Sequence, residues 1–328
     1  MVTITSTRLL KNKLKNFLHN NNVKKFLIAF SGGIDSTVLF HALNDLKEEH
    51  KISIRCIHIN HHLNNYSDEY YKHCIKFFKK YKAQYITGDI YIDDHSNIEE
   101  KLREERYKII TETVHADEYI LTAHHLDDQI ETFFLRLMRG SSPTGLSCMD
   151  TISYINSKPV ARPLIEIDKS IIRDYLDENN LEYIEDITNN SNEFDRNYIR
   201  NKIVPLFKKR WKGLNKTMLN NINQQKIYSY LTREYIQSKL LKLYNNNNSH
   251  ELLSAKLLDE NIHTQASLLH EWIRSKANLS LYNNQIQEIL KSVVNARNDS
   301  YPLFEYRTIK ITKSDNIIYL TKQKSVDS

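Results

Sequence analysis

The chain has 328 residues, 40% of them hydrophobic, and a formal net charge of +6 at pH 7. That length favours two domains, and no apolar run is long enough to cross a membrane. Three widely spaced cysteines argue against disulfides and against a Cys-x-x-Cys metal site, so we expect a cytoplasmic protein. The mildly basic charge is compatible with a nucleic-acid partner.

The first half of the chain alternates segments of strand and helix character. Apolar runs predict strands over residues 25–30, 52–59, 85–92 and 118–122. Amphipathic spacing and capping residues predict helices over residues 6–19, 38–46, 67–82 and 97–114, and from about 124. This alternation predicts an α/β fold with a doubly wound parallel sheet, in which ligands bind beyond the carboxyl ends of the strands.

The turn after the first strand reads Ser31-Gly32-Gly33-Ile34-Asp35-Ser36. A glycine-bearing turn between a strand and a helix directs backbone N–H groups and the helix N-terminus at one point, where a phosphate can bind. Gly32 and Gly33 allow a phosphate to approach the backbone, and Ser31 and Ser36 add hydroxyl groups. Asp35 would orient groups in the turn or a bound Mg²⁺. An ordinary strand-to-helix turn is the alternative interpretation.

A second polar cluster follows the fourth predicted strand. If a helix begins at about His124, then His124, Asp128 and Glu131 lie on one stripe of its surface. An imidazole and two carboxylates suit a Mg²⁺ shared with nucleotide phosphates, with Asp128 and Glu131 as the metal ligands. A solvated acidic helix start and the ligand set of a zinc hydrolase are the alternatives.

Several motifs together resemble one enzyme family. The turn at 31–36 resembles the pyrophosphate-binding loop of the N-type ATP pyrophosphatases, the PP-loop family. Further motifs resemble the tRNA(Ile)-lysidine synthetases; they lie at residues 58–63, 102–107, 123–132, 139–146, 162–164 and 185–200. Two positions depart from that family's pattern, because Asn64 stands where an arginine is frequent and Ser142 where a glycine is usual.

The resemblance implies a two-step reaction on tRNA(Ile) with a CAU anticodon. ATP adenylates the C2 oxygen of the wobble cytidine and releases pyrophosphate, and L-lysine then displaces AMP to give lysidine. The implied catalytic residues are Asp35, Arg106, His124, Asp128 and Glu131. The implied ATP contacts are Ser31, Gly32, Gly33, Ile34, Asp35, Ser36 and His58. Arg103 would contact the phosphates or the cytidine, although a solvated helix face is its simpler interpretation.

A run without acidic residues, 196–216, lies beside aromatic residues and predicts contact with the RNA backbone. Its candidate RNA contacts are Arg196, Arg200, Lys208, Lys209 and Arg210, of which the first two would face either the RNA or the ATP site. We expect residues 1–213 to form the PP-loop ATP-pyrophosphatase domain and residues 214–328 to form a smaller, mostly helical tRNA-binding domain with a terminal hairpin. The alternatives are a PP-loop tRNA thiolase and a non-catalytic RNA-binding module, and a homodimer is compatible with each.

Overall fold

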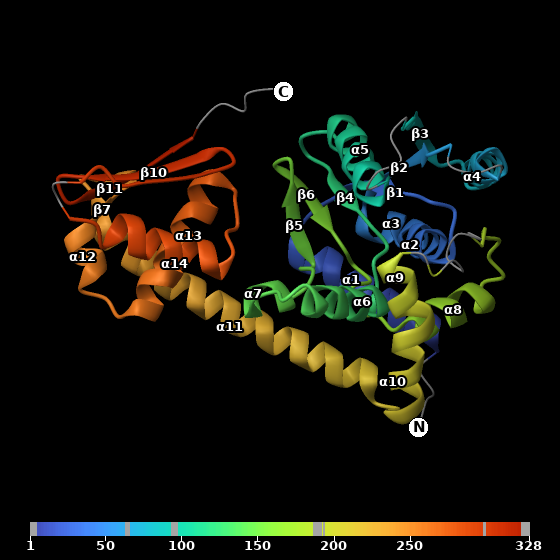
Figure 1. Cartoon of the computed structure of the whole chain (residues 1–328). Helices are drawn as coiled ribbons and strands as arrows, with labels where there is room; N and C mark the ends of the chain where they lie inside the picture. The colour runs from blue at the N-terminus through green and yellow to red at the C-terminus, as the bar shows by residue number, and fades with distance from the viewer. Residues whose placement is uncertain are drawn as a thin grey trace. The chain divides into compact units, whose positions relative to one another are not determined.

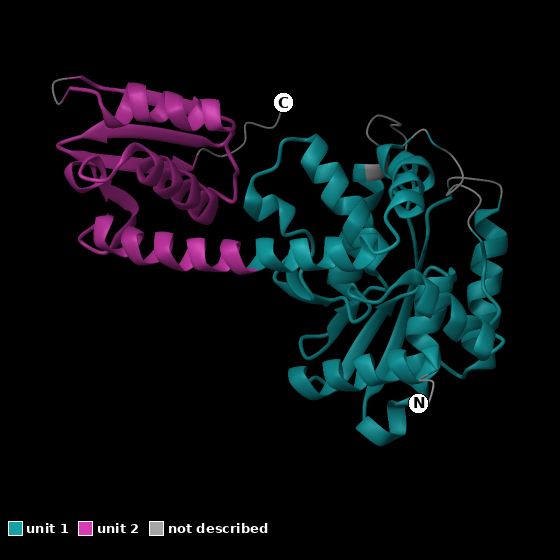
Figure 2. Ribbon diagram, turned by 90° about the horizontal axis from the view of Figure 1, so that it is seen from below, with its two compact units in different colours: residues 1–226 teal, residues 227–328 magenta. Residues whose placement is uncertain are grey.

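The computed structural model describes residues 5–62, 66–92, 98–185, 192, 194–297 and 300–322. The chain forms two compact units, residues 1–226 and 227–328 (Figure 2). The predicted domain boundary at residue 214 is the first residue of the long helix α11 (Leu214–Leu243), and the units divide further along the same helix. No helix in the described ranges has an apolar stretch sufficient to span a lipid bilayer.

The first unit is built on a six-stranded sheet in the order β3-β2-β1-β4-β6-β5 (Figure 1). Its strands are β1 (Lys25–Ala29), β2 (Ser53–Asn60), β3 (Gln84–Asp89), β4 (Tyr119–Leu121), β5 (Ile152–Ile155) and β6 (Lys158–Ala161). All neighbouring strands pair in parallel except β5 and β6, which are antiparallel. The predicted α/β class with a parallel sheet is confirmed. The chain order reverses between β1 and β4, the position in such sheets where ligands bind.

Helices cover both faces of this sheet because alternate side chains of β1 point to opposite faces. Phe26 and Ile28 belong to the core beneath the helices at 6–21, 34–45, 67–80 and 169–178, whereas Leu27 belongs to the core beneath the helix at 98–113. The helices are α1 (Ser6–Asn21), α2 (Ile34–Asp45), α3 (Lys47–His50), α4 (Ser67–Lys80), α5 (Ile98–Thr113), α6 (Leu126–Met138), α7 (Pro143–Leu146), α8 (Lys169–Glu178), α9 (Asp195–Tyr198), the π-helical turn η2 (Ile199–Ile203) and α10 (Val204–Arg210).

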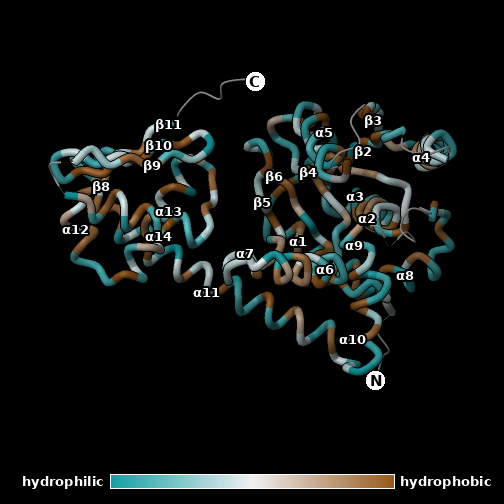
Figure 3. The backbone as a smooth tube through the Cα atoms, viewed as in Figure 1, coloured by the Kyte–Doolittle hydropathy of each residue, from teal (hydrophilic) through white to brown (hydrophobic). Residues whose placement is uncertain are grey.

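The second unit pairs helices with a five-stranded antiparallel sheet in the order β7-β8-β11-β10-β9. The strands are β7 (Tyr244–Asn245), β8 (Asn248–Leu253), β9 (Leu303–Tyr306), β10 (Ile309–Ser314) and β11 (Ile317–Lys322). The helices are α12 (Ser254–Leu258), α13 (Ile262–Ala277), α14 (Asn283–Ile289) and the π-helical turn η3 (Leu290–Val294). The predicted terminal hairpin is present as β10–β11. Hydrophobic residues recur along the elements of both units, as Figure 3 shows, and the core of this unit contains the fully buried Trp272.

Candidate active site at the carboxyl edge of the parallel sheet

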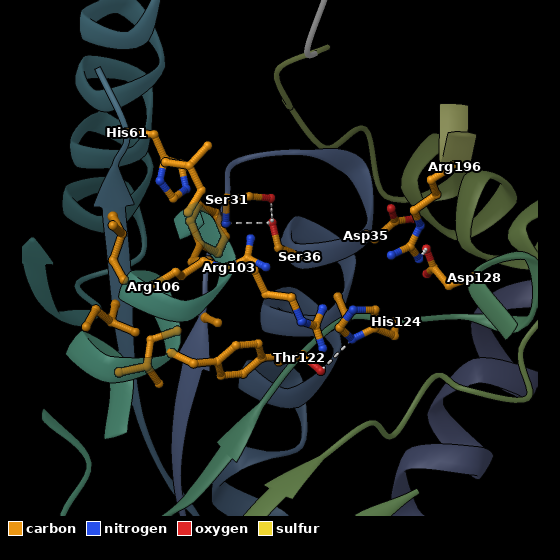
Figure 4. A pocket seen from close by; sticks show the side chains of 18 of the residues that line it. Ser31, Asp35, Ser36, His61, Arg103, Arg106, Thr122, His124, Asp128 and Arg196 are labelled. Atoms are coloured by element: carbon orange, nitrogen blue, oxygen red, sulfur yellow. Dashed lines mark hydrogen bonds and ion pairs between the residues drawn. The ribbon is translucent and has the colours of Figure 1, made fainter. Parts of the chain in front are cut away.

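A cleft of about 500 Å³ lies at the carboxyl ends of β1, β2 and β4 (Figure 4). Side chains from α5, α9 and η2 complete its walls. The predicted site residues that line it are Ser31, Asp35, Ser36, Arg103, Arg106, His124, Asp128, Arg196 and Arg200. Residues that are more than 150 positions apart in the sequence, such as Ser31 and Arg196, therefore meet in one site.

The loop between β1 and α2 is held in a fixed shape by its own serines. The backbone N–H of Ser31 donates to the Ser36 hydroxyl over 3.2 Å, and the N–H of Gly33 donates to the Ser31 hydroxyl over 3.3 Å. Gly32 has a φ of +84°, and a Cβ there would lie 2.8 Å from the Sγ of Cys74. Only glycine both adopts this φ readily and avoids the clash with Cys74. The backbone of the loop therefore stays accessible to a ligand at the N-terminus of α2.

Two arginines of α5 bring positive charge into the cleft. The guanidinium carbons of Arg103 and Arg106 lie 5.2 and 5.7 Å from the ring centre of Tyr107, which is buried. Within the described ranges, neither arginine has a carboxylate at ion-pair distance. Burial, together with the charges of Arg103 and Arg196, lowers the pKa of Arg106. Neighbouring cations without a neutralising carboxylate favour an anionic ligand in this cleft.

The other two arginines of the cleft are neutralised by carboxylates of α6. Glu131 accepts from Arg196 Nε over 2.9 Å and from Arg200 Nε over 2.7 Å. Arg196 Nη2 also donates to Asp128 Oδ1 over 2.9 Å. Burial would raise the pKa of Asp128, but the charges of His125 and Arg196 outweigh it and hold that pKa well below its usual range. Asp128 is therefore ionised, and the contacts of the two carboxylates with the arginines fix α9 and η2 against α6.

This arrangement bears on the expected Mg²⁺ ligands. Both oxygens of Glu131 accept hydrogen bonds from guanidinium groups, and Asp128 Oδ2 accepts from the backbone N–H of His125 over 2.9 Å. These carboxylates are thus poor metal ligands as placed. Asp35 fits better, because its Oδ1 is buried and accepts no hydrogen bond from any residue that the structure describes. The described residues contain no group of three or more His, Cys, Asp or Glu side chains suited to hold a metal ion by themselves.

The predicted helical stripe of His124, Asp128 and Glu131 is wrong in one member. Helix α6 begins at Leu126, so His124 lies in the loop before it and His125 is the N-cap. The carboxylate of Asp128 accepts from the N–H of His125, which starts the helix two residues later than predicted. His124 nevertheless lines the cleft, where its Nδ1 lies 2.8 Å from the Thr122 hydroxyl. Burial, with the charge of Arg196 nearby, lowers the pKa of His124 to about 4.

His125 is a site residue that the sequence analysis missed. Its Nε2 lies 3.6 Å from Asp35 Oδ2 and 3.5 Å from Asp128 Oδ2, so it links the PP-loop to α6. Burial would lower the pKa of His125, but the two carboxylates outweigh it and raise that pKa. The signal that could have identified it is the aspartate three residues later, a pattern typical of a helix N-cap.

Several predicted residues lie away from the cleft. His58 is buried, and its Nδ1 lies 2.9 Å from the carbonyl oxygen of Phe30. On α10, Lys208 forms an ion pair of 2.7 Å with Asp127, whereas Lys209 and Arg210 are exposed. The departure at position 64 and, within the motif at 185–200, residues 186–191 and 193 lie outside the described residues. Ser142 caps α7 by accepting from the N–H of Gly145 over 3.4 Å, so it has a local structural role.

Comparisons with known proteins identify the family of this site. The PP-loop domain model matches residues 6–207. A tRNA(Ile)-lysidine synthase from Buchnera aphidicola subsp. Schizaphis graminum is 35% identical over 317 residues, which cover 96% of this chain and 71% of the relative. The chain belongs to the tRNA(Ile)-lysidine synthase family. A member from Coxiella burnetii is 32% identical over 302 residues, covering 92% of this chain and 67% of its own.

A solved structure supports the fold, whereas the cysteines of this chain argue against the thiolase alternative. A U34-tRNA thiolase from Methanococcus maripaludis with its [4Fe-4S] cluster aligns with a TM-score of 0.54 at 17% identity, covering 67% of this chain and 78% of that one. In this member of the lysidine synthase family the three cysteines are free and buried. Burial raises the pKa of Cys74 to about 12 and that of Cys148 to about 11. Such thiols are poor nucleophiles and poor cluster ligands.

Proposed function

We propose that this chain is an ATP-dependent ligase that converts the wobble cytidine of a CAU-anticodon tRNA(Ile) to lysidine. The observation that carries the proposal is the meeting, in one cleft, of the loop at 31–36 and two arginines that have no carboxylate partner among the described residues. The loop and the N-terminus of α2 offer backbone donors to an anion, and Arg103 and Arg106 offer charge. A triphosphate satisfies both features.

In the first step, the C2 oxygen of the cytidine attacks the α-phosphorus of ATP, and the bond to the leaving pyrophosphate breaks. The loop holds that pyrophosphate, while Arg106 stabilises the charge that develops on the transferring phosphoryl group. A Mg²⁺ would be held beside Asp35, whose buried Oδ1 has no hydrogen-bond partner among the described residues, and would neutralise the phosphates. The placement of Asp128 and Glu131 suits a supporting role, because they hold Arg196 and Arg200 in the wall of the cleft.

In the second step, the lysine amine attacks C2, the C2–oxygen bond breaks, and AMP leaves. The amine must be neutral to attack and loses a further proton afterwards, and these protons pass to the solvent. His124 lines the cleft and, with its pKa near 4, is neutral at physiological pH. The positive charge near the reacting groups therefore comes from the arginines, and His124 can accept a hydrogen bond from the incoming amine or the cytidine.

The tRNA body is larger than the cleft and requires a surface outside it. Lys209 and Arg210 are exposed and suit phosphate contacts, and we assign the same general task to residues 227–328. The three reduced, buried cysteines and a tRNA substrate fit an enzyme of the cytoplasm.

The test is pyrophosphate release from ATP in the absence of lysine, with an unmodified tRNA(Ile) transcript. We expect release to require the transcript and to disappear when the wobble cytidine is replaced by uridine, which presents a different C4 group beside the same C2 oxygen. Release that is independent of the anticodon would contradict the proposal. Sulfur transfer to the transcript would instead support the thiolase alternative.

A further inference from the structure

An exposed pair of stacked aromatic rings lies at the carboxyl ends of β2 and β3. The rings of His62 and Tyr91 have centroids 4.6 Å apart and planes only 8° from parallel. Tyr91 is 75% exposed, so the imidazole covers only part of it and a large part of the phenol ring meets solvent. We call His62 and Tyr91 the aromatic platform. An exposed flat ring of this kind can stack on another planar group.

Hydrogen bonds hold the inner ring of the platform in place. The backbone N–H of His62 donates to Asn60 Oδ1 over 3.1 Å, and its Nε2 lies 2.7 Å from Asp89 Oδ1. Asn60 and Asp89 are themselves paired in the register of β2 and β3. Because the sheet fixes these partners, a ligand that stacks on the platform need not order the imidazole first.

The platform lies beside the cleft but is not part of its lining. Ile59 and His61 line the cleft, and the chain leaves it at the next residue, His62. Figure 4 shows His61 on the side of the cleft opposite Asp128. A planar group stacked on Tyr91 is therefore distinct from one held inside the cleft. Two planar groups bound side by side are what adjacent nucleotides of a single strand provide.

We propose that the aromatic platform binds, by stacking, the base of a nucleotide adjacent to the wobble cytidine. The inference rests on the proposed function, which sends the cytidine itself into the cleft. A nucleotide drawn into an active site leaves the stack of its loop, and its neighbours lose stacking partners in turn. Proteins that bind single-stranded RNA restore this stacking with aromatic side chains, without reading the base by hydrogen bonds. The platform would thus hold the anticodon loop open.

The test measures binding of a fluorescent CAU anticodon stem-loop to the full chain. We expect Tyr91→Ala to raise the Kd about tenfold, because loss of one stacking aromatic weakens single-strand binding about 5- to 150-fold. Tyr91→Trp should retain wild-type affinity. Tyr154→Ala is the matched control, because Tyr154 is 69% exposed on β5 of the same sheet, and it should leave the Kd unchanged.

An abasic nucleotide placed on either side of the wobble cytidine identifies the stacked base. At one of the two positions, the abasic loop should bind wild-type protein and Tyr91→Ala with the same Kd, because the shared contact is already lost. The inference would be overturned if, at both positions, the abasic nucleotide and Tyr91→Ala weakened binding additively. It would also be overturned if the Kd were unchanged for Tyr91→Ala and for His62→Ala. Weaker ATP binding by Tyr91→Ala without RNA would assign the platform to adenine instead. Lysine incorporation by the wild-type chain tests the proposed function separately.

Discussion

Replacing Glu131 by glutamine distinguishes a structural carboxylate from a metal ligand. Its side chain is 2% exposed and neutralises Arg196 and Arg200, which are 24% and 28% exposed. Removing one partner of a buried ion pair costs about 3–5 kcal/mol. The glutamine side chain keeps one oxygen that can accept a hydrogen bond, and Asp128 still accepts from Arg196. We therefore expect the lower end of that range, a loss of about 3 kcal/mol in the unfolding free energy of the first unit.

The assay is urea unfolding without ATP or Mg²⁺, followed by ¹⁹F NMR of protein labelled with fluorotryptophan. The chain has two tryptophans, Trp211 in the first unit and Trp272 in the second, so each signal reports one unit. The Trp211 signal should lose its folded form at lower urea, while the Trp272 signal stays as in wild type. Glu166→Gln is the control, because its ion pair with Lys13 is exposed and worth at most about 1 kcal/mol.

The reasoning is refuted if the unfolding free energy of Glu131→Gln lies within about 1 kcal/mol of the wild-type value, because that is the contribution of a surface ion pair. In that case the contacts of Glu131 with the two arginines would contribute little. A loss of stability in Glu131→Gln that appears only when Mg²⁺ is added would then support the interpretation of Glu131 as a metal ligand.

Three further predictions concern the loop, the neutral histidine and the basic residues. Gly32→Ala should abolish measurable ATP binding, because its Cβ would clash with a buried thiol, whereas Gly140→Ala, with φ of +66° and open space, should not. His124 has a pKa near 4 in the folded state and about 6.5 in the unfolded state, so the protein loses stability as the pH falls from about 6.5 to about 4. His124→Asn should remove that loss, measured by urea unfolding over a series of pH values. Lys209→Ala with Arg210→Ala should weaken tRNA binding and reduce the slope of log Kd against log salt by about 1 to 2, measured by filter binding; an unchanged slope would show a solvated face.

The sheet and the PP-loop could be predicted because their signals are local. The continuous apolar run of β1, buried from Phe26 to Ile28, the glycines at 32 and 33, and the serines at 31 and 36 are all adjacent in sequence. Strand ends of a parallel sheet meet at one edge, which placed the loop and the segment after β4 together.

The pairing of charges could not be predicted in the same way. Arg196 and Arg200 are 65 and 69 residues from Glu131, so no spacing rule connects them, and a buried carboxylate looks the same in sequence whether its partner is arginine or metal. The start of α6 was misplaced because two adjacent histidines both suit the position before a helix. The N–H of His125, bonded to Asp128, selects the second.

The most direct test of the central claim is incorporation of labelled L-lysine into an unmodified tRNA(Ile) transcript with a CAU anticodon. The account predicts incorporation that needs ATP, releases AMP and pyrophosphate in equal amounts, and yields lysidine at the wobble position on nucleoside analysis. Asp35→Ala should bind the transcript as wild type does but incorporate no lysine. Absence of lysine from the transcript, with ATP still cleaved on another substrate, would contradict the account.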